Sequence, residues 1–470
     1  MFRIFLSKAA AICIISALVR AGAAQTVANP QPATSQPTLT VCTANPTDAE
    51  MADCVRQEFR HAWAGYKQYG WGHDALKPLS KSSHDWYGVP LLMTPVDALD
   101  TMILMGMNDE ATTTREYIIK NLSFERDIYV KNFEITIRLL GGLLSSYQLT
   151  GDQRLLNLAD DLGTRLLPAF NSPTGMPYVN VNLKTGAVRG EVTNPAEIGT
   201  LLIEFGALSK LTGKPVYYEK AKRAVVELYK RRSPIGLVGS SINVKTGEWT
   251  DLTSHISGGI DSYYEYLLKA WLLFDDKDCE RMWKASIEAV NKYLADQAPT
   301  GFWYGQSNMI TGARTGTTFG SLDAFLPGTL ALSGDVDRAR KLEESAYKMW
   351  TTFDIEPEEM NYLTMKITYD GYELRPEIIE SAYYLHHFTK DPRYRDMGRT
   401  FFNSLTKYCR NDLAYAALSN IEKKTQKDEM ESFFFAETLK YLFLLYAPAD
   451  TLDLSKVVFN TEAHPIRRTW

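Results

Sequence analysis

Seven segments of the chain are apolar on nearly every face of a helix, and amphipathic segments separate them. The apolar segments are residues 95–106, 133–149, 196–211, 261–274, 321–332, 376–388 and 431–446. Segments such as 217–231 and 339–351 instead have one apolar and one charged face. A helix that is apolar all round is buried all round, whereas an amphipathic helix covers a core. The pattern predicts seven buried helices that alternate with outer helices.

Similar polar junctions end the apolar segments. Residues 149–152, 211–215 and 388–392 share an apolar residue, then Thr, then Gly or Lys, and two of them add Pro. Gly just past a helix end and Pro at a helix start are the expected stop and start signals. Weaker copies occur at residues 107–109, 275–278, 333–335 and 447–450, and most of the seven junctions lie about sixty residues apart.

Such a repeat can build either an open solenoid or a closed ring. The concave face of a solenoid is wet, which does not suit inner helices that are apolar on every face. We therefore predict an all-α fold, a closed ring of seven inner and seven outer helices.

The first 41 residues have the composition of targeting and leader segments. Arg3 and Lys8 precede an apolar run at 9–19 and small residues at 21–24, which is the order of a signal peptide. An uncleaved membrane anchor is the alternative. Residues 25–41, rich in Thr, Pro, Gln and Ala, indicate a disordered leader. We predict a signal peptide at 1–24, a leader at 25–41 and a single barrel at 42–470. The protein is then exported, to a periplasm or medium, or to the lumen of the secretory pathway in a eukaryote.

Composition and cysteine usage exclude some classes of function. A net charge of -5 gives no electrostatic case for a nucleic-acid partner. No segment after the N-terminus is apolar for long enough to span a bilayer. Cys42, Cys54, Cys279 and Cys409 form no CxxC or Cys/His cluster, which argues against zinc. Export permits a disulfide, for which Cys42 and Cys54 are the plausible local pair, and the other two can be buried thiols.

The apolar segments share one exception to their pattern, which is a set of acidic residues. These are Asp97, Asp100, Glu134, Glu197, Glu204, Asp261, Glu265, Asp323, Glu377, Glu380, Glu431 and Glu437. Buried acids are costly unless they are paired or functional. Most lie ten or more residues before a junction, near the start of their helix. If the inner helices are parallel, these acids gather at one mouth of the ring.

Each acid also has a structural explanation. The helix macrodipole favours acids near an N-terminus, and Glu134 with Arg138, or Arg375 with Glu380, could be ion pairs. Repetition around the ring, together with interleaved aromatic residues, favours a carbohydrate site, because sugars need both stacking faces and hydrogen-bond acceptors. Two carboxylates are the minimum equipment of a glycosidase, and their spacing along the chain leaves the stereochemistry open.

Nine motifs give the chain a close resemblance to a known family. They lie at residues 61–66, 69–72, 97–101, 133–142, 261–268, 325–328, 374–381, 431–438 and 460–465. In this order they resemble glycoside hydrolase family 47, the class I α-1,2-mannosidases, from about residue 56 to 465. The resemblance implies an (α/α)7 barrel, in agreement with the seven junctions, and we expect a bacterial member.

The resemblance also implies roles for individual residues. Glu134 resembles the general acid of the family, acting through a water, and Glu377 resembles the general base, with Asp261 as the rival catalytic carboxylate. Thr461 resembles the ligand of Ca²⁺, through its carbonyl and hydroxyl oxygens. Residues that resemble the lining of the pocket for the terminal mannose are Arg138, Glu197, Arg375, Pro376, Phe433, Glu437 and Glu462.

The function implied is that of a monomeric, exo-acting, inverting and calcium-dependent α-1,2-mannosidase. Its substrate would be a mannose-containing oligosaccharide, glycoprotein glycan or mannobiose. The alternatives are a mannose-binding, lectin-like member with little turnover and a helical scaffold whose acids are all structural. Gly258-Gly259 and Ser321-Leu322 are more similar to the mannosidase-like proteins of endoplasmic-reticulum quality control than to the processing enzymes.

Overall fold

The computed structural model describes Cys42 and residues 46–470. The predicted signal peptide (1–24) and leader (25–41) lie outside the described residues. A disulfide joins Cys42 to Cys54 with their Cα atoms 6.0 Å apart, and Cys279 and Cys409 are buried free thiols. Among the described residues, no helix is both long and apolar enough to cross a membrane.

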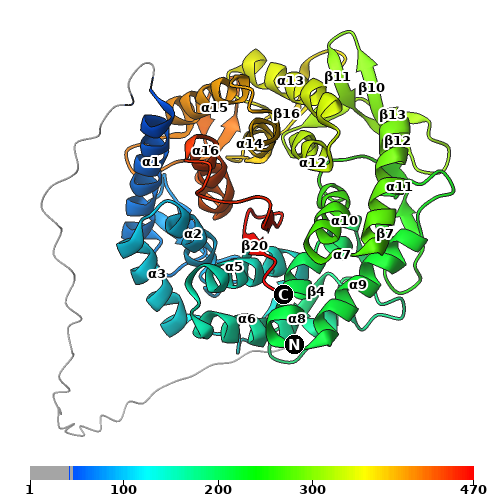
Figure 1. Ribbon diagram of the computed structural model, residues 1–470, viewed down its shortest axis with the longest axis horizontal. Coiled ribbons are helices and arrows are strands. Elements are labelled where there is room, and N and C mark those ends of the chain that lie inside the picture. Colours follow the sequence, from blue (N-terminus) through cyan, green and yellow to red (C-terminus); the bar gives the residue numbers. More distant parts are fainter. Residues whose placement is uncertain (1–41, 43–45) are drawn as a thin grey trace, which may run out of the picture. The chain divides into compact units, whose positions relative to one another are not determined.

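Residues 46–470 form two concentric layers of helices (Figure 1). The seven inner positions are α2 (Met93–Leu104), the run α4, η1 and α5 (Asn132–Ile135, Thr136–Leu140, Gly141–Thr150), α7 with α8 (Pro195–Gly199, Leu202–Thr212), α10 (Asp261–Phe274), η3 with α12 (Leu322–Phe325, Leu326–Ser333), α14 (Glu377–Thr389), and η5 with α16 (Phe434–Thr438, Leu439–Tyr446). The seven outer positions are α1 (Asp48–Tyr69), α3 (Asn108–Asn121), α6 (Gln153–Leu166), α9 (Pro215–Lys230), α11 (Lys277–Tyr293), α13 (Val336–Phe353) and α15 with η4 (Arg393–Ser404, Leu405–Cys409). A short 3-10 turn, η2 (Leu167–Phe170), follows α6.

The prediction of a closed (α/α)7 barrel is confirmed, but the order of its last pair was wrong. The seventh inner position is followed by a hairpin rather than by an outer helix, because residues 451–470 lack an amphipathic helical period. The seventh outer helix is α1, at the other end of the barrel sequence. The ring closes where α1 packs against α16 (Figure 1).

The predicted junctions end the inner helices as expected. Gly151, Gly213 and Gly334 adopt the left-handed conformation just past α5, α8 and α12, where a side chain would be strained. At the start of the next outer helix, Asp152 and Asp335 accept hydrogen bonds from backbone N–H groups. These tight turns set each outer helix antiparallel to the inner helix before it, so all inner helices run in the same direction.

Small antiparallel sheets lie in the longer connections that lead from an outer helix to the next inner helix. The helical pattern did not predict these sheets. Their strands are β1 (Ala75–Lys77) and β2 (Ser82–His84); β3 (Tyr129–Lys131), β4 (Asn180–Asn182) and β5 (Val188–Arg189); β6 (Val192–Thr193), β7 (Ser241–Asn243) and β8 (Trp249–Asp251); β9 (Thr253–Ser254), β12 (Gln306–Asn308) and β13 (Arg314–Gly316); β10 (Ala295–Ala298) and β11 (Gly301–Tyr304); β14 (Thr318–Gly320), β15 (Glu359–Asn361) and β16 (Lys366–Tyr369); and β17 (Leu418–Asn420) and β18 (Thr425–Gln426). Each of these strands lies between the end of an outer helix and the start of the next inner one. The strands therefore surround the N-terminal ends of the inner helices.

The last hairpin has a different position. Strands β19 (Val457–Phe459) and β20 (Pro465–Arg467) follow the last inner helix, and the turn between them enters the middle of the ring (Figure 1). Gly141 on α5 makes room for this turn, since a Cβ there would lie 2.5 Å from the side-chain nitrogen of Asn460. The hairpin turn closes the barrel from within.

Candidate active site

A cavity of about 270 Å³ opens at the N-terminal ends of the inner helices, and all eleven predicted site residues line it. They are Glu134, Arg138, Glu197, Asp261, Arg375, Pro376, Glu377, Phe433, Glu437, Thr461 and Glu462. Five different inner positions and the C-terminal turn contribute to this set. The structure therefore brings these residues together around one cavity, and the role of each residue stays a prediction.

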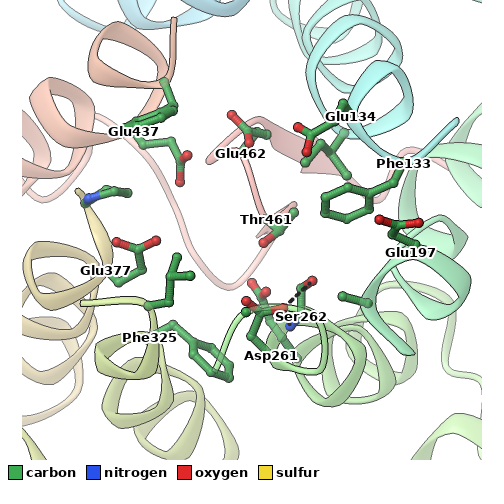
Figure 2. Close-up of a pocket in the computed structure, with 18 of the residues that line it drawn as sticks. Phe133, Glu134, Glu197, Asp261, Ser262, Phe325, Glu377, Glu437, Thr461 and Glu462 are labelled. Carbon is green, nitrogen blue, oxygen red and sulfur yellow. Dashed lines mark hydrogen bonds between the residues drawn. The ribbon is translucent and has the colours of Figure 1, made fainter. Parts of the chain in front are cut away.

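The three predicted catalytic carboxylates face the cavity from three directions. Asp261 and Glu377 are the first residues of α10 and α14, and Glu134 lies in the first turn of α4. Figure 2 shows Glu134 and Glu377 on opposite sides of the cavity, with Asp261 on a third side and Thr461 between them. Because parallel inner helices begin at the same end of the barrel, acids at their first turns converge here.

The C-terminal turn supplies the floor of this cavity. Glu462 accepts a hydrogen bond from Arg138 Nη1 at 2.6 Å, and the backbone N–H of Thr461 donates to the hydroxyl of Tyr266 at 3.2 Å. The side chain of Asn460 donates to the carbonyl oxygen of Ile137 at 2.8 Å, so the turn is tied to the inner helix that carries Arg138.

A buried ionic cluster fixes the far side of the same turn. His464 Nδ1 lies 2.7 Å from Asp100 Oδ2, and its Nε2 lies 3.2 Å from Asp97 Oδ1. Lys440 Nζ lies 2.8 Å from the second oxygen of Asp100 and donates to the carbonyl oxygen of Ala463 at 2.6 Å. Asp97 and Asp100 were expected at the mouth of the ring. They do not line the cavity, and instead contact the turn that forms its floor. Asp100 lies seven residues into α2, about 10 Å below its start at 1.5 Å per residue.

Other predicted acids also have structural partners. Glu204 accepts hydrogen bonds from Tyr266 and from Asn460, and Glu431 accepts one from the indole of Trp86 at 3.0 Å. The proposed pair of Arg375 with Glu380 was wrong. Arg375 pairs with Glu358 at 3.0 Å, and Glu380 instead accepts a hydrogen bond from the hydroxyl of Tyr441 at 3.0 Å.

Carboxylates outnumber cations in the cavity. The acids are Glu134, Glu197, Asp261, Glu265, Glu377, Glu380, Glu437 and Glu462, and the cations are Lys131, Arg138 and Arg375. Desolvation by the surrounding protein raises the pKa of Glu377 to about 8, although Arg375 opposes the shift. Desolvation likewise raises the pKa of Asp261 to about 7, opposed by the N–H of Ser262 and reinforced by the charge of Glu265. The cavity is therefore short of positive charge.

Aromatic faces border the two arginines. The guanidinium carbons of Arg138 and Arg375 each lie 5.7 Å from the ring centre of Phe433. Phe433 therefore contacts both cations and offers an apolar surface beside them, which suits the CH face of a sugar.

The sequence analysis missed several residues of this site. Lys131, at the end of β3, lies 2.8 Å from Glu197 Oε1 and 3.8 Å from Glu134 Oε1. Asn194 caps α7 by accepting the backbone N–H of Glu197 at 2.9 Å. Both belong to short loop and strand segments, where helical periodicity carries no information. The only available signal was their position just before a predicted acidic residue.

A ring of paired helices that directs carboxylates and aromatic faces into a pocket closed at its floor defines a carbohydrate-active hydrolase. The family model described as "Glycosyl hydrolase family 47" matches residues 58–468, and the chain belongs to this family. It is accordingly a glycoside hydrolase.

Relatives and solved structures agree with this assignment. Alpha-mannosidase I MNS4 of Arabidopsis thaliana is 41% identical over 436 residues, which are 88% of this chain and 69% of the plant protein. The ER degradation-enhancing alpha-mannosidase-like protein 2 of Mus musculus is 37% identical over 458 residues, 90% of this chain and 78% of that protein. The solved alpha-1,2-mannosidase from Trichoderma reesei superposes with a TM-score of 0.83 at 29% identity, and the match covers 90% of this chain and 100% of that one. These proteins come from a plant, a mammal and a fungus, so the comparisons do not bear out the expected bacterial source.

Proposed function

We propose that the protein is an exo-acting, inverting and calcium-dependent α-mannosidase that releases terminal α-1,2-linked mannose from oligomannose glycans or mannobiose. The observation that carries this proposal is the placement of Glu134 and Glu377 on opposite sides of one closed-ended cavity (Figure 2). The solved fungal structure of the same fold, described as an alpha-1,2-mannosidase, supports the linkage.

The closed floor supports exo-action. The turn at Thr461 and Glu462 blocks the barrel, and the cavity of about 270 Å³ suits a single sugar ring with a few waters. A chain of sugars could enter only by its terminal residue, and the rest of the glycan would lie outside, among the hairpins that surround the mouth.

The proposed reaction uses two carboxylates in different protonation states. Glu134, protonated, gives its proton through a water to the oxygen of the leaving sugar as the glycosidic bond breaks. Glu377 acts in its ionised form, which Arg375 and a bound calcium ion would favour against the burial that raises its pKa to about 8. It takes a proton from the water that attacks the anomeric carbon from the opposite side. The product is then β-mannose. Asp261 is the rival for the second role, since it also faces the cavity from the start of its helix.

The residues of the floor suit a calcium ion. Ca²⁺ takes six to eight oxygen ligands in flexible geometry, and Thr461 offers a hydroxyl and a carbonyl oxygen at the centre of a carboxylate-rich cavity. Within the described residues, Glu377 Oε2 has no hydrogen-bond partner, and no three His, Cys, Asp or Glu side chains are arranged to hold a metal directly. Thr461, waters and sugar hydroxyls would therefore provide the ligands. Bound calcium would supply positive charge that orients the sugar and its attacking water.

The test is to incubate the purified protein with α-1,2-mannobiose, with and without calcium, and to follow the products by proton NMR. We expect hydrolysis only with calcium, and β-mannose as the first anomer formed. Initial α-mannose would refute inversion, and the absence of any hydrolysis would refute the enzymatic proposal.

A second candidate function is mannose binding with little turnover. The similarity to the mouse ER degradation-enhancing protein, together with Gly258-Gly259 and Ser321-Leu322, supports it. A lectin needs no protonated carboxylic acid, so Glu134→Gln would leave its binding and its physiological activity unchanged. The same substitution would abolish the function of a hydrolase.

We also propose that the protein is exported and monomeric. The disulfide between Cys42 and Cys54 supports an oxidising compartment, because such bonds are rare where thiols are kept reduced. The corresponding test is thiol titration of the protein expressed in the cytosol and of the exported protein. We expect the disulfide to be lost in the first and present in the second.

A further inference from the structure

Lys131 places a cation at the mouth of the cavity. Its side chain is 37% exposed, whereas those of Arg138 and Glu462 at the floor are 8% and 5% exposed. Strand β3 fixes its backbone through pairing with Asn180 of β4, and its N–H donates to the hydroxyl of Tyr87 at 3.2 Å. Lys131 is therefore a built part of the cavity wall and is not a freely moving surface residue.

Two carboxylates hold the ammonium group of Lys131 in place. Its Nζ lies 2.8 Å from Glu197 Oε1 and 3.8 Å from Glu134 Oε1. Glu197 is itself fixed, since its other oxygen accepts a hydrogen bond from Thr193 at 2.6 Å. Figure 2 shows Glu134 and Glu197 along the same wall of the cavity, with Phe133 between them.

The other two cations of the cavity are already engaged by protein groups. Arg138 contacts both Glu134 and Glu462, and Arg375 makes several hydrogen bonds to Glu358. An ammonium group has three donors. One N–H of Lys131 is directed to Glu197 and a second faces Glu134. The third N–H can therefore donate to a ligand at the open mouth.

The position of Lys131 relative to Glu134 decides which part of a substrate it can meet. If the terminal sugar fills the floor and Glu134 serves the glycosidic oxygen, the next sugar must lie on the mouth side of Glu134. That is the side on which Lys131 is exposed. This step rests on the proposed function, because it takes Glu134 as the group beside the glycosidic bond.

We propose that Lys131 is a substrate-binding residue that donates a hydrogen bond to the sugar on the leaving side of the scissile bond. It therefore adds affinity for a disaccharide and none for free mannose. A role confined to holding Glu197 would instead affect both ligands equally, since Glu197 lines the pocket for the terminal sugar.

The experiment measures binding by calorimetry with full-length protein and two probes, mannose and the S-linked analogue of α-1,2-mannobiose, which resists hydrolysis. Lys131→Met keeps the apolar stem and removes the donors. It should weaken the affinity for the thiodisaccharide about tenfold, the scale of one hydrogen bond from a charged donor. The affinity for mannose should change by less than about twofold. Lys131→Arg restores a charged donor and should recover most of the loss.

The matched control is Lys214→Met, which removes a lysine that pairs with Asp160 of the outer helix α6 and does not line the cavity. It should change neither affinity. Equal losses for mannose and the thiodisaccharide, or no loss for either, would overturn the proposal.

The outcome also separates this inference from the proposed function. A selective loss on Lys131→Met in a protein that never hydrolyses mannobiose would refute the hydrolase proposal and leave the binding role of Lys131 standing. Hydrolysis of mannobiose with unchanged thiodisaccharide binding in Lys131→Met would refute only the role of Lys131. A wild-type protein that binds neither probe would refute both.

Discussion

His464 Nδ1 lies 2.7 Å from Asp100 Oδ2, and this buried contact joins the C-terminal turn to the first inner helix. The other ring nitrogen faces Asp97, so both nitrogens donate and the ring is an imidazolium. Burial alone would lower the pKa of His464, but Asp100 and Asp97 raise it to about 9. The position of the cavity floor therefore depends on a charged cluster formed by residues more than three hundred positions apart.

Replacement of His464 should destabilise the protein strongly. His464→Leu leaves Asp97 and Asp100 buried with less compensation, and breaking a buried ion pair by removing one partner costs about 3–5 kcal/mol. Urea unfolding should show a loss of this size in the free energy of unfolding. The exposed residue His84, on strand β2, provides the control His84→Leu. A loss no larger than that of the control would show that the cluster does not hold the turn.

The metal-free protein should lose stability as pH rises. The pKa of Glu377 is raised from 4.5 to about 8 in the folded state, so between these values the folded chain binds a proton that the unfolded chain lacks. Stability is then full below about pH 4.5 and declines until about pH 8, by at most about 1.4 kcal/mol per pH unit for this group. Chemical denaturation at several pH values measures the slope.

Glu377→Gln should flatten that pH dependence, because the amide does not titrate. Glu288→Gln, on the exposed face of α11, is the control and should leave the slope unchanged. An identical slope in Glu377→Gln and wild type would mean that Glu377 titrates normally in the folded protein.

Those parts of the fold that follow from periodicity could be predicted from the sequence. Helices that are apolar on every face must be inner helices. Gly151, Gly213 and Gly334 end them, because glycine adopts the left-handed conformation without the steric cost that a side chain adds. The convergence of Asp261 and Glu377 also followed, since each begins its helix at the same end of the barrel.

The rest depends on contacts between distant segments. The strands have two to four residues, too short for a period-two pattern to stand out. Nothing in the neighbouring sequence indicates that Asn460 contacts Ile137 inside the barrel or that Asp100 contacts His464. Each of these contacts joins residues more than three hundred positions apart. Lys131 was missed as well, since it lies on the short strand β3 and its partner Glu197 lies on α7.

Amide substitutions should separate catalysis from binding. Glu134→Gln and Glu377→Gln should each lower turnover of α-1,2-mannobiose by at least about a hundredfold, the usual scale of general acid–base catalysis. Binding of the thiodisaccharide should survive better, because the amides keep the shape. Glu288→Gln again serves as control. If Glu377→Gln stays active while Asp261→Asn does not, Asp261 is the base.

Chelation should abolish activity, and calcium should restore it. Thr461 lies at the centre of a cavity in which acids outnumber cations, so a bound divalent ion would offset the uncompensated charge. Calcium should also raise the melting temperature, which magnesium should do less well because it demands stricter geometry. Thr461→Val removes the hydroxyl ligand and should weaken calcium binding measured by calorimetry. Full activity of the metal-stripped protein would refute the calcium site.

The last prediction concerns the range of substrates. Gly259 lines the cavity beside Asp261, and its φ of +93° lies in the left-handed region. The atoms nearest to a Cβ at this position would all belong to Asn194, at 3.6 Å or more, so there is open space beside Asp261. The wild type should therefore cleave several α-1,2-linked termini, including mannobiose, and Gly259→Arg should narrow this range. Gly259→Ala is the matched control, because it carries the backbone strain, about 1 kcal/mol, without the bulk. Assays on mannobiose and branched oligomannose decide the question. If the wild type already cleaves one branch exclusively, or if the alanine variant narrows the range as much as arginine does, the open space does not set specificity.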